Sequence, residues 1–184
     1  MTTIANSPVE ALEQQRLATA KRDGYALLPV AAGDGHPGFV YTIGMAQVDF
    51  PELLCFVEPG MEEATLGLMS NLCPMLIESV QRFGRTETLR AFCRRQFTAR
   101  DPQVTYRPQF LQGESYLYAL KAWVTRAVRF RQELGMPQVI ELQHAGVPTL
   151  DAVRAQQSTL EQTLRAQALA RESQMSFADD SETS

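Results

Sequence analysis

Residues 37–59 constrain the fold more than any other part of this 184-residue chain. This segment reads PGFVYTIGMAQVDFPELLCFVEP, and it holds two short apolar runs, residues 39–45 and 52–57, with a turn between them. Short runs that are rich in β-branched and aromatic residues and bounded by turn residues are typical of strands. A short connection favours antiparallel pairing of the strands that it joins. The sequence therefore predicts a β-hairpin at the centre of the domain.

Helical patterns flank this hairpin. Residues 8–22 lie between a Ser-Pro start and a glycine stop, which is typical of a helix. Residues 61–83 carry leucines at helical spacing, with Ala64, Leu68, Leu72 and Leu76 on one face and Pro74 predicting a kink. Residues 115–134 predict the longest helix of the chain, because an apolar stripe runs between two glycines.

Three further segments predict strands. Residues 25–32 are short and apolar, and Pro29 inside them favours an edge position because proline cannot donate a ladder hydrogen bond. Residues 104–107 and 139–142 are expected to extend the sheet. We therefore expect an α+β fold: a small, mostly antiparallel sheet covered on one face by the helices at 61–83 and 115–134.

The chain is expected to divide into an N-terminal helix (1–23), the α+β domain (24–148), an amphipathic C-terminal helix (149–172) and a disordered acidic tail (173–184). The C-terminal helix carries a seam at coiled-coil spacing. Its members are Leu150, Val153, Gln157, Leu160, Leu164 and Gln167. Three heptads are marginally stable alone. The helix therefore predicts a homo-oligomer or a protein partner.

Charge is spread unevenly, although the net charge is only −4. Residues 1–84 carry −6, residues 85–131 carry +7 and residues 132–184 carry −5. Arginine suits carboxylates and phosphates, so the middle band predicts an anionic partner unless the fold itself neutralises it. An acidic protein is one such partner, whereas a pI of about 5.3 disfavours nucleic acid. The candidate residues are Arg90, Arg94, Arg95, Arg100, Arg107, Arg126 and Arg129.

The polar residues of the hairpin suggest a second kind of site. Tyr41, Thr42 and Glu52, around the small Gly44 and with His36 nearby, would suit a small-molecule pocket. The structural alternative is that Tyr41 and Thr42 are simply good strand formers, and that Glu52 caps or pairs at the surface. Gly44 also predicts that some group approaches the backbone closely there.

Other chemistry has little support. The three cysteines, Cys55, Cys73 and Cys93, are odd in number and widely spaced, which predicts buried free thiols. The only histidines, His36 and His144, have no ligand-like spacing with a cysteine or with each other, so we expect no metal and no cofactor. A Cys55–His36 nucleophile pair stays open, since such partners need only meet in space. There is no phosphate-binding glycine loop and no nucleophile elbow.

The hairpin motif resembles a known family. Residues 41–45 (YTIGM), followed by residues 50–53 (FPEL) and an apolar strand, are similar to the hallmark of the domain-of-unknown-function 4262 family. The resemblance covers residues 24–84, with Met45 where leucine is usual. Further on, Leu150 stands where that family commonly has tryptophan. The resemblance implies no substrate or reaction, because none is attached to the family.

Together these features predict a non-enzymatic protein-interaction module that uses an Arg-rich surface and an oligomerising C-terminal helix. The alternatives are a small-molecule binder or enzyme with a pocket near residues 41–44, and nucleic-acid binding through residues 85–131. No apolar run approaches the ~18 residues of a membrane span, and the first residues do not form a secretory signal. We therefore expect a cytoplasmic protein without membrane contact.

Overall fold

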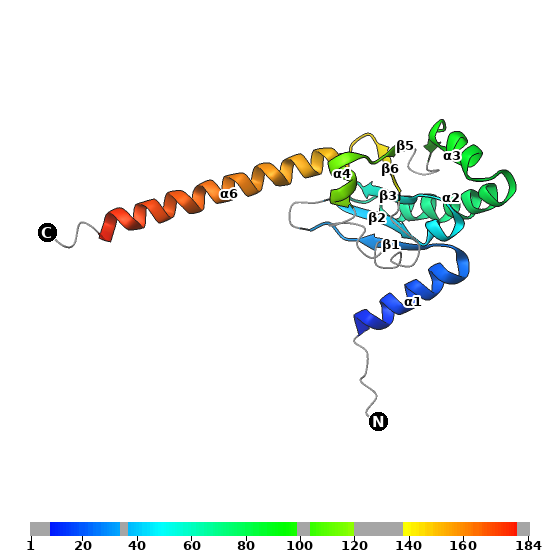
Figure 1. Ribbon diagram of the computed structural model, residues 1–184, viewed down its shortest axis with the longest axis horizontal. Helices are drawn as coiled ribbons and strands as arrows, with labels where there is room; N and C mark the ends of the chain where they lie inside the picture. Colours follow the sequence, from blue (N-terminus) through cyan, green and yellow to red (C-terminus); the bar gives the residue numbers. More distant parts are fainter. Residues whose placement is uncertain (1–7, 34–36, 99–103, 120–137, 180–184) are drawn as a thin grey trace, which may run out of the picture.

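One six-stranded sheet organises the molecule (Figure 1). The computed structural model describes residues 8–33, 37–98, 104–119 and 138–179. The strands lie in the order β1-β2-β3-β6-β5-β4 across the sheet. Their bounds are β1 Ala26–Val30, β2 Gly38–Ile43, β3 Glu52–Val57, β4 Phe97–Thr98, β5 Thr105–Phe110 and β6 Val139–His144.

The sheet is mixed but mostly antiparallel, which confirms the expected α+β class. Strands β1, β2 and β3 form an antiparallel meander, in which Tyr41 lies opposite Leu54. Strand β6 joins β3 in parallel, with Glu52 opposite Val139, and the pairs β5–β6 and β4–β5 are antiparallel. Strand β1 lies at one edge, as Pro29 predicted.

Helices surround the sheet, and one of them leaves it. In Figure 1, α6 projects from the body as a long single helix, away from α2 and α3. It runs past the predicted boundary at residue 172 to Asp179 and is the longest helix in the described part of the chain. Most of the predicted helix at 115–134 lies outside the described residues. The bounds are α1 Pro8–Asp23, the 3₁₀ helix η1 Met45–Val48, α2 Glu62–Phe83, α3 Arg85–Cys93, α4 Gly113–Tyr118 and α6 Leu150–Asp179.

The two faces of the sheet bury two separate apolar clusters. We call them the α2 face and the α6 face, after the helices that cover them. On the α2 face, Leu53 packs with Leu72 of α2 and Phe92 of α3. On the α6 face, Leu54 packs with Leu150 at the start of α6 and with Ala119 just after α4.

The expectation that both helices cover one face of the sheet is therefore wrong. The helix at 61–83 and the start of the predicted helix at 115–134 cover opposite faces of the sheet. Every residue of β3 is apolar or internally hydrogen-bonded, so both faces of this strand have to be shielded from water. Of the four residues predicted to share a face of α2, Leu72 and Leu76 are buried, whereas Ala64 and Leu68 are only partly buried. The buried residues of α2 are Thr65, Met69, Leu72, Cys73 and Leu76.

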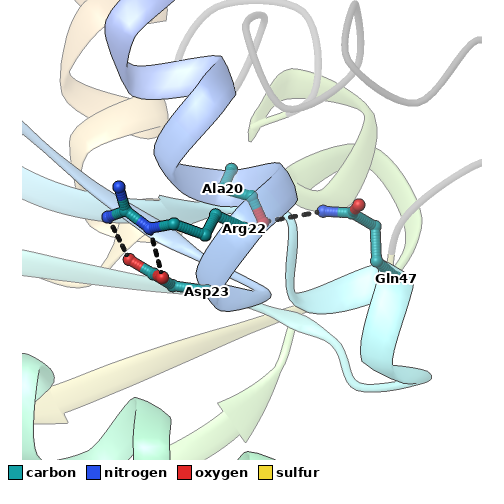
Figure 2. A network of polar contacts seen from close by, with 4 residues as sticks. All are labelled: Ala20, Arg22, Asp23 and Gln47. Carbon is teal, nitrogen blue, oxygen red and sulfur yellow. Dashed lines mark hydrogen bonds and ion pairs between the residues drawn. The ribbon is translucent and has the colours of Figure 1, made fainter.

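Helix α1 ends against the β2–β3 hairpin (Figure 2). Its last turn carries a surface ion pair between Arg22 and Asp23, with two contacts of 2.7 Å. Gly24, at φ +83°, then closes the helix by donating its N–H to the carbonyl of Ala20 at 2.9 Å. Among the described residues, no helix has both the length and the apolar character that a membrane crossing requires.

Candidate functional site

A buried carboxylate lies at the turn of the β2–β3 hairpin. Glu52 is fully buried, and its Oε2 accepts a hydrogen bond from the Thr42 hydroxyl at 2.7 Å. Its Oε1 accepts from the N–H of Gly44 at 3.0 Å. The N–H groups of Met45 and Ala46 approach the two oxygens at 3.4 and 3.5 Å. The charge of Glu52 is thus surrounded by donors from its own hairpin.

These contacts are those of a helix cap. The first N–H groups of any helix lack an acceptor inside the helix, and a carboxylate there is favourable. Glu52 supplies that acceptor to η1 from the far side of the hairpin. The Thr42 Oγ1 also accepts the N–H of Leu53 at 2.8 Å, so the hydroxyl is bonded in both directions. The network joins the end of β2, the turn and the start of β3 into one unit.

Gly44 provides the space that this turn needs. It has φ +100°, and an added Cβ would lie 3.0 Å from the Cβ of Ala20 and 3.1 Å from the carbonyl oxygen of Gly24. The Ala20 carbonyl also accepts from Nε2 of Gln47 at 3.1 Å, as Figure 2 shows. The group that approaches the backbone at Gly44 is therefore helix α1 of the same chain.

The structure brings together only part of the predicted pocket. Thr42, Gly44 and Glu52 meet in one network, whereas Tyr41 is buried on the α6 face because neighbouring strand residues point to opposite sides. His36 lies outside the described residues. The Glu52 oxygens are occupied by donors from the chain itself, which favours a structural role for this cluster. Ligand binding at Tyr41, Thr42, Gly44 and Glu52 stays a prediction.

A second buried carboxylate, which our sequence analysis missed, caps α6. Glu141 on β6 is buried, and its Oε1 accepts the N–H of Leu150, the first residue of α6, at 2.7 Å. Its Oε2 accepts from Nε2 of Gln143 at 2.8 Å. Burial raises the pKa of Glu141 above its ordinary value, although these two hydrogen bonds oppose the shift. The signal in the sequence was a lone glutamate inside an apolar strand that shortly precedes a helix.

Glu141 should make the stability of the protein depend on pH. Because the folded chain holds the Glu141 proton more tightly than the unfolded chain does, its contribution is complete below the ordinary pKa of 4.5 and is lost as pH rises through the raised pKa. Glu141→Gln keeps an acceptor for Leu150 and cannot ionise. Urea unfolding at a series of pH values should therefore show the variant gaining on the wild type as pH rises from 4.5 to neutral. Parallel stability curves would contradict this cause.

The thiols differ in exposure. Cys55 and Cys73 are buried as expected, and burial raises the pKa of each thiol far above its ordinary value. The expectation is wrong for Cys93, which is exposed because Phe92, one step round α3, takes the inward position. A raised thiol pKa is the opposite of what a cysteine nucleophile needs. Within the described part of the chain, no cluster of three or more His, Cys, Asp or Glu side chains could hold a metal ion.

His144, the histidine within the described residues, is part of the core. The ring of His144 lies 4.7 Å from that of Tyr106 between centroids. Its Nδ1 lies 3.0 Å from the carbonyl of Ala145, and its Nε2 lies 3.2 Å from the carbonyl of Phe56. These contacts tie the end of β6 to β3 and β5.

The Arg band divides between two sides of the molecule. Arg90, Arg94 and Arg95 are exposed on and just after α3, and Arg90 pairs with Glu87 one turn earlier. Arg107 is exposed on β5 but points away from the α2 face, since its neighbour Tyr106 is buried there. No described residue forms an ion pair with Arg94, Arg95 or Arg107. Three further candidates lie outside the described residues, namely Arg100, Arg126 and Arg129.

An apolar groove runs between α2 and α3, and our sequence analysis did not predict it. The α2–α3 groove has a volume of about 410 Å³. Met75 and Phe83 stand exposed on its α2 side, at 58% and 60%, and Arg95 lines its α3 side. In the sequence, Met75 and Phe83 form a second apolar stripe on α2, because residues eight apart lie on the same side of a helix. This stripe was the signal for the groove.

The apolar seam of α6 extends beyond the part of the helix that packs on the sheet. Leu150 and Val153 are buried on the α6 face, whereas Leu160 and Leu164 are 52% and 55% exposed. Leu169 is also exposed, at 64%, but 100° per residue places it on the opposite side of the helix from Leu160. The stripe that docks in the first turn thus continues into solvent.

Comparisons with protein-family models, with curated proteins and with solved structures gave no match. The resemblance of residues 24–84 to the domain-of-unknown-function 4262 family accordingly stays a prediction that rests on residues 41–45 and 50–53.

Proposed function

We propose that this protein is a non-enzymatic protein-interaction module that self-associates through α6 and presents an Arg-rich surface. The observation that carries the proposal is the seam of α6, which is buried at Leu150 and Val153 and exposed at Leu160 and Leu164. Every side chain from residue 158 to 169 is exposed, so no described part of the body supports this stretch of helix.

A helix without tertiary contacts lacks the packing that stabilises most helices in proteins. Isolated helices of this length are marginal in water, and most helix stability in proteins comes from packing of an apolar face. Leu160 and Leu164 are 52% and 55% exposed, so burying the rest of each side chain would contribute about half of the roughly 1.5–3 kcal/mol that full burial of a leucine gives. Their spacing of four residues, in register with Val153, fits pairing with another helix. The exposed Arg94 and Arg95 add a surface suited to carboxylates.

Charge placed on the seam tests the proposal. The variant Leu160→Glu/Leu164→Glu should sediment as a monomer at concentrations at which the wild type self-associates, because two carboxylates would have to be buried. Its far-UV circular dichroism should also show less helix, because the separated α6 frays. The body should keep its unfolding midpoint, since both leucines are exposed.

Leu169→Glu provides the matched control on the other side of the same helix. It adds a carboxylate at an equally exposed leucine and should leave the association unchanged. A wild-type chain that stays monomeric at every concentration would overturn the proposal. Equal loss of association in both variants would show that the seam is not the contact.

A further inference from the structure

The α2–α3 groove and the distal end of α6 have complementary chemistry. We propose that residues 172–184 of one copy dock into the α2–α3 groove of a second copy. This inference rests on the proposed function, since it names the surface that receives the projecting helix.

The groove has the character of a docking surface. Its floor includes Leu76, Phe92 and Phe97, and its α2 side exposes Met75 and Phe83. Large apolar side chains that are exposed side by side mark interaction sites more often than single exposed ones do. An apolar groove between two helices also suits an amphipathic segment that places a few anchor side chains into it.

The charge around the groove favours an acidic docking segment. Residues 82–97 carry five arginines and one glutamate, a net charge of +4. Glu87, which lines the groove, is already paired with Arg90 on α3, and Arg85 is paired with Asp49 outside the groove. Arg95 lines the groove, and Arg94 is the residue before Arg95 in the chain. Neither arginine has an ion pair with a described residue. An occupant with carboxylates close to its apolar anchors would match this arrangement.

The end of this chain has that composition. Residues 172–184 read ESQMSFADDSETS, with four acidic residues and no basic one. Phe177 supplies one large apolar residue close to Asp179 and Asp180, whereas Met175, two residues earlier, lies about 200° away from it around a helix. The backbone is helical as far as Asp179, so the segment would arrive partly ordered and would lose less entropy on binding.

A second copy has to provide this segment. Helix α6 has 30 residues and is therefore about 45 Å long at 1.5 Å per residue. Figure 1 shows it leaving the body on the side away from α2 and α3. An intact α6 thus carries its end away from the groove of its own chain. Such a contact is reciprocal in a two-fold dimer and head-to-tail in a ring or filament.

Sedimentation of the full-length chain with altered charges tests the docking. Arg94→Glu/Arg95→Glu should weaken self-association about 10-fold or more, with a smaller effect at high salt, because like charges would face each other. Asp179→Arg/Asp180→Arg should weaken it to a similar extent. The matched control is Lys21→Glu/Arg22→Glu, which changes the net charge of the chain as much as the groove variant does, at exposed sites outside the groove, and should leave association unchanged.

Mixing the two weakened variants gives the decisive measurement. The groove variant keeps the natural tail and the tail variant keeps the natural groove, so an equimolar mixture should recover association close to that of the wild type. No recovery on mixing, or an equal loss in the Lys21→Glu/Arg22→Glu control, would overturn the docking. A second contrary result is that the groove and tail variants associate normally while Leu160→Glu/Leu164→Glu loses association. That result would overturn the docking and leave the proposed function standing. A wild-type chain that is always monomeric would overturn the proposed function as well.

Discussion

Glu52→Ala is expected to lower the free energy of unfolding by about 3 kcal/mol or more, because several buried donors would lose their acceptor at once. The Thr42 hydroxyl and the Gly44 N–H are the closest of these donors, at 2.7 and 3.0 Å. The cavity left by the side chain adds to the loss. Urea unfolding followed by circular dichroism measures the change.

Two further glutamate variants give this prediction its control. Glu52→Gln keeps the shape and one acceptor oxygen but turns an amide donor toward other donors, so its stability should fall between those of the wild type and Glu52→Ala. Glu78→Ala removes an exposed carboxylate from α2 and should stay within about 0.5 kcal/mol of the wild type. A Glu52→Ala chain as stable as Glu78→Ala would show that the hairpin does not depend on this cap.

Gly44→Ala should lower the free energy of unfolding by about 2–3 kcal/mol, through backbone strain and crowding together. At φ +100° a side chain is disfavoured, and its Cβ would stand 3.0 Å from the Cβ of Ala20. The carbonyl oxygen of Gly24, at 3.1 Å, belongs to the backbone and cannot turn aside. Relief of the crowding would push α1 away from the hairpin, so limited proteolysis should cleave at the end of α1 sooner than in the wild type.

Gly67→Ala is the matched control for this substitution. Gly67 lies inside α2, and nothing stands within 4 Å of the position that a Cβ would take. The variant should be as stable as the wild type or more stable by up to about 1 kcal/mol, because alanine favours the helix. A Gly44→Ala chain that behaves like Gly67→Ala would mean that α1 does not press on the hairpin.

Local sequence patterns were enough to locate several elements. The apolar run ELLCFV became β3 with the expected bounds, and the Ser-Pro start and glycine stop bracketed α1. Pro29 placed β1 at the edge, since a residue without an N–H interrupts the ladder of an inner strand. These properties depend on the residue itself or on neighbours within a few positions.

The candidate site was less accessible to the same reasoning. Tyr41, Thr42 and Glu52 were singled out correctly as the polar residues of the hairpin, but their partners were not predictable. Glu52 finds the N–H of Gly44, and Glu141 finds the N–H of Leu150, only when the chain has folded back on itself. A glutamate in an apolar strand looks the same in sequence whether it faces solvent, a ligand or a helix end.

By itself, the sequence determined which residues are extended, which are helical and where charge accumulates, because propensity, periodicity and turn chemistry act over a few residues. Tertiary structure decided the parallel pairing of β3 with β6, the helices that cover each face of the sheet, and the groove between α2 and α3. It also decided that Leu150 is buried while Leu160 is exposed on the same seam. These outcomes depend on contacts between residues far apart in the chain, and no local pattern encodes such contacts.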